Sequence, residues 1–185
     1  MTCIVGVVDD NDLVWMGADS AGVDDQWVSQ PQAAKKIFYL WNMVVGFSTS
    51  FRFGQIVRYR LNFSSEEMRS SQQDTTRWMC TTFVDKLRAC LLDNGFARKE
   101  PEGEDAGGLL LVGMNGNLYE IATDFSVLSP IAPYAAIGCG AQVALGALHA
   151  TGHLSSEERI RAALAAAADH SAGVSEPFHV LGVKP

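Results

Sequence analysis

Residues 2–8, TCIVGVV, are an apolar and mostly β-branched run that is typical of a buried strand. A similar run, LVWMGA at residues 13–18, follows the turn-forming cluster DDND. The two runs predict a hairpin, and residues 36–40 (KIFYL) and 43–48 (MVVGFS) predict another one. We therefore expect two hairpins before any helix.

The middle of the chain shows helical spacing of apolar residues. Residues 51–63 (FRFGQIVRYRLNF) predict a first helix, which is followed by a polar loop rich in Ser, Glu and Gln. A longer amphipathic helix is expected to begin near Trp78 and to end near Asn94. Residues 98–106 (RKEPEGEDA) combine Pro, Gly and charge, which predicts a mobile surface loop within one domain.

The last third returns to strands and then to helices. Residues 108–122 predict a hairpin with a type I′ turn at Asn115-Gly116, and residues 134–138 predict a further strand. Small residues at 141–151 predict a helix, a capping box at Ser155 begins another one, and FHVLGV closes the chain as a strand. This order predicts an α+β fold in which helices pack on the outer faces of antiparallel sheets.

The bulk composition restricts the class of protein. With 185 residues and 48% hydrophobic composition, we expect one domain over residues 1–185. A net charge of −7 without a basic cluster disfavours nucleic-acid binding. No apolar stretch is long enough to cross a membrane and no signal-peptide pattern is visible, so we expect a cytoplasmic protein. The scattered cysteines and histidines predict no disulfide framework, metal site or cofactor.

Three residues form a chemically coherent set: Thr2, Asp19 in GADSAG, and Lys36 in KKIF. Each alone has an ordinary structural explanation, as a strand, turn or solvated residue. A threonine hydroxyl needs an adjacent base, and a free α-amine with a pKa of about 8 can serve once Met1 is removed. An ammonium would favour the unprotonated amine, and a carboxylate would hold that ammonium in place.

In the order of its motifs the chain resembles the proteasome β-subunit family, and especially its HslV-type members, which are N-terminal nucleophile hydrolases. The resemblance rests on TCIVGVV, GADSAG, KKIF, VVGFS, IGCG and AAADHSAG, and it covers nearly the whole chain. It implies a four-layer αββα sandwich of two antiparallel sheets flanked by helices. It also implies a homo-oligomeric ring and an ATP-dependent unfoldase as partner.

The resemblance implies specific roles. Thr2 becomes the nucleophile, whose own α-amine is the base, and Lys36 becomes the ammonium partner that Asp19 orients. Gly46 in VVGFS matches the family glycine whose backbone N–H faces the oxyanion. Asp169 matches the family aspartate that supports the threonine by hydrogen bonding.

Some positions differ from the family pattern. Cys139 stands where the family usually has a serine near the nucleophile's amine, and its thiol is a weaker hydrogen-bonding group. Ala172 occupies the place of another serine, although the adjacent Ser171 could substitute for it.

Three functions are therefore open at this point. The first is a threonine peptidase that acts on peptides or unfolded proteins through an acyl-enzyme on Thr2. The second is an N-terminal nucleophile hydrolase of small amides. The third is a catalytically silent ring or scaffold subunit, which the differences at Cys139 and Ala172 favour.

Overall fold

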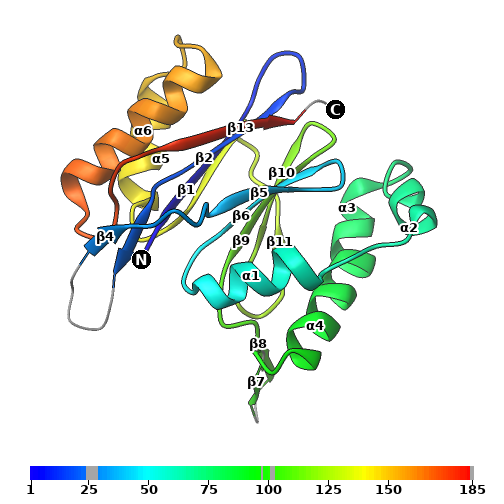
Figure 1. Cartoon of the computed structure of the whole chain (residues 1–185). Helices are drawn as coiled ribbons and strands as arrows, with labels where there is room; N and C mark the ends of the chain where they lie inside the picture. Colours follow the sequence, from blue (N-terminus) through cyan, green and yellow to red (C-terminus); the bar gives the residue numbers. More distant parts are fainter. Residues whose placement is uncertain (24–28, 97, 101–102, 184–185) are drawn as a thin grey trace.

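The computed structural model describes residues 1–23, 29–96, 98–100 and 103–183. Two antiparallel sheets lie face to face, and a group of helices covers the outer face of each sheet (Figure 1). This is the expected αββα arrangement, and the α+β fold class is confirmed.

The first sheet has four strands and contains the N-terminal run. Its strands are, in spatial order, β12 (Tyr134–Gly138), β1 (Cys3–Val8), β2 (Val14–Ala18) and β13 (His179–Val183). Because β1 is central, its two faces are both buried: Cys3 and Val5 face the helices, whereas Ile4 faces the other sheet. This burial on both faces explains why β1 is a continuous apolar run in the sequence.

The second sheet has five strands. Its strands are, in spatial order, β11 (Val127–Leu128), β10 (Asn117–Ile121), β9 (Leu110–Met114), β6 (Met43–Phe47) and β5 (Ile37–Leu40). Asn115 and Gly116 join β9 to β10 with φ of 48° and 71°, which are the positive values of the predicted type I′ turn.

Two groups of helices cover the sheets. On the first sheet lie α5 (Ala141–Ala150) and α6 (Ser156–His170). On the second sheet lie α1 (Phe51–Arg60), α2 (Ser65–Ser70), α3 (Thr75–Trp78), the π-helical turn η1 (Met79–Phe83) and α4 (Val84–Asp93).

The expected polar loop after the first helix is wrong in part, because α2 lies within it. Ser64 and Glu67 form a capping box there, with hydrogen bonds of 3.1 and 2.7 Å. Met68 is buried in the hydrophobic core between the second sheet and its helices. One buried residue in six gives no helical periodicity, so the capping box was the only signal in the sequence.

The expected loop at residues 98–106 is also wrong where the structure describes it. Arg98–Glu100 (β7) and Gly103–Asp105 (β8) pair as antiparallel strands, whereas residues 101–102 lie outside the described part. Arg88 of α4 donates to Glu104 at 2.7 Å, a tertiary contact that no local pattern reveals. A further short pair that we did not predict joins β3 (Ala21–Val23) to β4 (Ser29–Pro31).

Gly138 connects the fold to the start of the chain. Its φ is +94°, and a Cβ atom there would lie 2.2 Å from the carbonyl oxygen of Thr2. Both the conformation and the contact require glycine. We expect Gly138→Ala to destabilise the fold by about 2 kcal/mol or more and to displace Thr2.

Urea unfolding followed by circular dichroism measures this effect. Gly152→Ala is the matched control, because a Cβ atom at Gly152 meets no atom within 4 Å. Equal midpoints for the two variants would contradict the role given to Gly138.

Candidate active site

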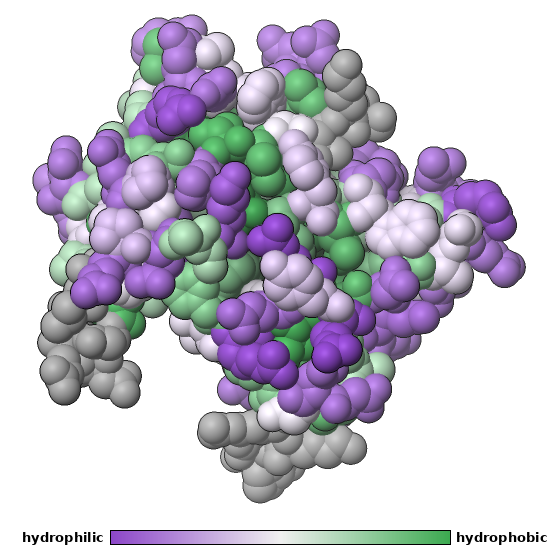
Figure 2. All heavy atoms as spheres, viewed as in Figure 1, coloured by the Kyte–Doolittle hydropathy of each residue, from purple (hydrophilic) through white to green (hydrophobic). Residues whose placement is uncertain are grey.

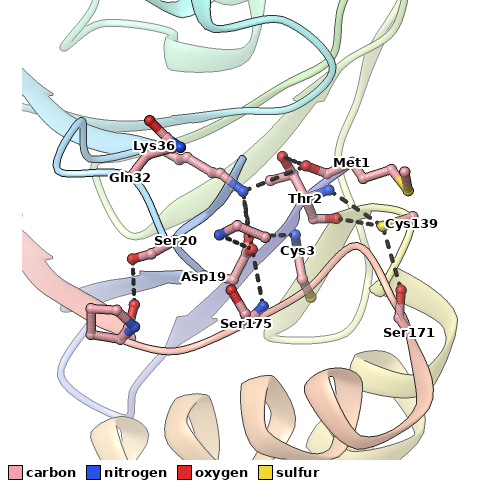
Figure 3. Close-up of polar contacts among 12 residues, drawn as sticks. Met1, Thr2, Cys3, Asp19, Ser20, Gln32, Lys36, Cys139, Ser171 and Ser175 are labelled. Atoms are coloured by element: carbon pink, nitrogen blue, oxygen red, sulfur yellow. Dashed lines mark hydrogen bonds and ion pairs between the residues drawn. The ribbon is translucent and has the colours of Figure 1, made fainter. Parts of the chain in front are cut away.

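Three polar side chains meet at one end of the two sheets. Thr2 immediately precedes β1, Asp19 immediately follows β2, and Lys36 immediately precedes β5. The three side chains lie close together (Figure 3). All three are buried, with exposed fractions of 3%, 0% and 1%. The structure thus brings together the set that the sequence analysis singled out.

The Asp19 carboxylate lies at the centre of a hydrogen-bond network. It accepts backbone N–H groups from Cys3 at 2.9 Å, Ala21 at 2.9 Å and Ser175 at 3.4 Å. Its two oxygens also accept the Lys36 ammonium, at 2.9 and 3.0 Å. These donors compensate the burial of the carboxylate, and the carboxylate in turn holds the ammonium in place.

Lys36 is a buried cation with one carboxylate partner among the described residues. Burial lowers the pKa of the Lys36 ammonium, and the nearby Asp19 carboxylate partly opposes this effect. Besides Asp19, the ammonium contacts the Met1 carbonyl oxygen at 3.5 Å and lies 6.0 Å from the centre of the Phe51 ring. A lysine of lowered pKa inside a polar network is a common feature of reactive sites.

Thr2 has polar contacts at both its hydroxyl and its nitrogen. The hydroxyl donates to the carbonyl oxygen of Met1. The backbone N–H donates to the Cys139 sulfur at 3.3 Å, and the Ser171 hydroxyl donates to the same sulfur at 3.5 Å (Figure 3). If Met1 is removed, this nitrogen becomes an α-amine next to the Cys139 sulfur, which Ser171 contacts in turn.

A small cavity lies beside Thr2. Its volume is about 40 Å³, which is room for roughly one water molecule. The residues that line it come from four parts of the chain: Met1, Thr2, Ala21, Val23, Lys36, Phe47, Thr49, Ser50 and Phe51. Met1 itself forms part of the wall, so its removal would open the space next to the threonine hydroxyl.

Gly46 is not among the residues that line this cavity. It lies in β6, with Ile37 opposite it on one side and Leu111 on the other. Thr49 lies nearer, since it lines the cavity and has an unusual φ of 86° for a β-branched residue. Within the described part of the chain, its N–H donates to no backbone carbonyl.

Asp169 lies in the last turn of α6 with its side chain exposed, and within the described residues it makes no hydrogen bond to Thr2. Ser171, which the sequence analysis considered as a substitute for the serine missing at Ala172, reaches the site through Cys139. The sequence analysis missed Ser175 and Ala21, because they act through backbone N–H groups and no side-chain pattern marks such donors.

Comparisons with solved structures place this fold. The chain is similar to the BPH of Thiobacillus denitrificans in complex with epoxomicin, with 18% identity, a TM-score of 0.80, and coverage of 99% of this chain and 98% of that chain. A second structure of that BPH gives a TM-score of 0.79 at the same identity. The chain is also similar to the eukaryotic HslV from Trypanosoma brucei, with 20% identity, a TM-score of 0.74 and full coverage of both chains.

The protein therefore has an HslV/proteasome-type fold over its whole length, as the order of motifs predicted. No family model matches the sequence, and no curated protein matches it. In the described part of the chain, no helix has the length and hydropathy that crossing a membrane requires.

Proposed function

We propose that the protein is a threonine peptidase of the HslV/proteasome type, with Thr2 as its nucleophile. The observation that carries the proposal is the buried pairing of Lys36 with Asp19 beside Thr2. Burying two charges is costly, and replacing such a pair with apolar residues is often neutral or stabilising. A role in the chemistry of the neighbouring Thr2 would explain why this costly pair is buried here.

The chemistry would follow from the positions of these groups. After Met1 is lost, the α-amine of Thr2 takes the proton of its hydroxyl, and the oxygen attacks the carbonyl carbon of a peptide bond. The leaving amine receives that proton, and an ester joins the acyl part to Thr2. Water then hydrolyses the ester and regenerates the threonine.

Lys36 and the main chain would stabilise the charge that develops. The Lys36 ammonium favours the unprotonated amine and the alkoxide, and Asp19 keeps this ammonium in place. The family resemblance assigns the oxyanion donor to Gly46. Thr49, however, lines the cavity, and within the described residues its N–H has no backbone acceptor. We therefore favour Thr49 for that role. One such donor contributes about 3 kcal/mol of transition-state stabilisation.

The proposal extends to a single-domain subunit of a cytoplasmic homo-oligomeric ring that encloses its sites and works with an ATP-dependent unfoldase. The eukaryotic HslV and the BPH found above have the same fold, which supports this extension. Large apolar side chains also lie exposed on the isolated chain, with Leu128 at 53% and Ile131 fully exposed. Contacts between subunits would remove such side chains from water.

Intact mass spectrometry of untagged protein, incubated with epoxomicin, tests the function. The Thiobacillus denitrificans BPH was solved with this compound, which is an epoxyketone that needs both the hydroxyl and the amine of an N-terminal threonine. We expect a mass without Met1 that carries one adduct per chain. The same sample under native conditions should give the mass of a ring.

A chain that keeps Met1 and forms no adduct, but still assembles, would favour the silent ring subunit. Adduct formation together with hydrolysis of small amides and no peptide cleavage would favour the amidohydrolase. A monomer at micromolar concentration would contradict the ring.

A further inference from the structure

A large open cavity lies next to the candidate active site, on the side of α1. Its volume is about 620 Å³, far more than the space beside Thr2. The Phe47 and Phe51 rings line both cavities and lie edge to face with centroids 6.0 Å apart. The two cavities therefore share a wall. A peptide whose carbonyl lies at Thr2 can place the side chain of that same residue in the larger cavity.

The charge of this cavity is opposite to that of the whole protein. The chain has 21 acidic and 14 basic residues, yet four cations and no described carboxylate line the cavity. These cations are Lys35, Arg52, Arg58 and Arg60. Strongly hydrophilic side chains accordingly cover α1 in the lower centre of Figure 2.

These four cations are available to a ligand. Among the described residues, none of them forms an ion pair with a carboxylate. The Arg58 guanidinium lies over the rings of Phe38 and Tyr59, at 5.6 and 5.2 Å from their centroids, which holds the group in place and leaves its N–H donors free of a carboxylate.

Arg52 has no stabilising role in its own helix. It lies in the first turn of α1, which contains no acidic residue, and a cation there is opposed by the helix dipole. Arg58 and Arg60 lie in the last turn, where the dipole favours them. Local helix stability therefore explains Arg58 and Arg60 and leaves Arg52 unexplained.

We propose that this cavity binds an acidic side chain of the substrate, at the residue whose carbonyl Thr2 attacks, and that Arg52 is its main partner. Guanidinium groups bind carboxylates through paired, charge-assisted hydrogen bonds. The inference rests on the proposed function and adds to it the substrate class: peptides cleaved after Glu or Asp.

Fluorogenic peptides that differ only at this residue test the inference. With acetyl-Ala-Ala-Xaa-aminomethylcoumarin, we expect kcat/KM to be about tenfold higher for Glu than for Gln, and lowest for Lys. Arg52→Gln should lower the Glu-to-Gln ratio to near one. Arg69→Gln, which changes an exposed arginine on α2, is the matched control and should keep the ratio.

The outcomes separate this inference from the proposed function. If epoxomicin labels the protein and the peptides are cleaved with no preference for Glu, the inference is overturned and the peptidase stands. If neither labelling nor cleavage occurs, binding of BODIPY-labelled Glu and Gln peptides to Thr2→Ala decides by fluorescence anisotropy. Weaker binding of the Gln peptide, by about tenfold and only while Arg52 is present, supports the cavity; equal binding overturns it.

Discussion

Replacing Thr2 with alanine is expected to lower peptide hydrolysis on the order of 10⁴-fold or more. The hydroxyl is the only group in the proposed mechanism that forms a bond to the substrate, and loss of a nucleophile has effects of at least this size. Thr2→Ser should retain a measurable fraction of the activity, because it keeps both the hydroxyl and the α-amine. Initial rates with a fluorogenic peptide, compared at equal ring concentration, measure the difference.

Thr123→Ala serves as the control for this prediction, since it removes the same atoms from an exposed position outside the site. Its rate should equal that of the unchanged protein. Residual hydrolysis by Thr2→Ala above a few per cent would assign the chemistry to another residue or to a contaminant.

Replacing Lys36 with methionine is expected to abolish activity and to destabilise the fold by about 3–5 kcal/mol. The stability is lost because Asp19 then remains as a buried charge without its ammonium. The double variant Lys36→Met/Asp19→Asn removes both charges and keeps an acceptor for the backbone donors. Its free energy of unfolding should return to within about 2 kcal/mol of the unchanged protein, whereas its activity should stay absent.

Urea unfolding and peptide hydrolysis, measured on both variants, separate the two roles of the pair. If the double variant recovered activity together with stability, Lys36 would be only a structural residue. If Lys36→Met were as stable as the unchanged protein, the charge on Asp19 would not depend on the lysine.

Much of the fold could be predicted from the sequence, because the main strands leave strong local signals. The hairpin at Asn115-Gly116 needs two residues of positive φ, and its flanking apolar runs leave no other interpretation. The helix that begins after Ser155 has its capping box and a regular apolar face. In contrast, α2 and the strands β7 and β8 are short and bury little. Whether such short elements form depends on tertiary contacts such as the hydrogen bond from Arg88 to Glu104.

The candidate site was predictable to a similar extent. Thr2, Asp19 and Lys36 carry distinctive side chains at strand ends, and the structure brings them together. Gly46 and Asp169 came from the family pattern alone, and whether they reach the cavity depends on strand register and on where α6 ends. Neither property can be determined from a few letters of sequence.

The hydrogen bonds around Thr2 and Asp19 also determine when the site can form during synthesis. The sulfur that accepts the Thr2 N–H is 137 residues further along the chain, and the Ser175 N–H that reaches Asp19 is 156 residues away from it. A growing chain folds from its N-terminal end as it leaves the ribosome, and contacts of such long range form last. An unfinished chain therefore holds a threonine whose surroundings are incomplete until Ser175 has been added and has folded onto Asp19. Under the proposed function, the peptidase would stay inactive towards neighbouring nascent proteins until then.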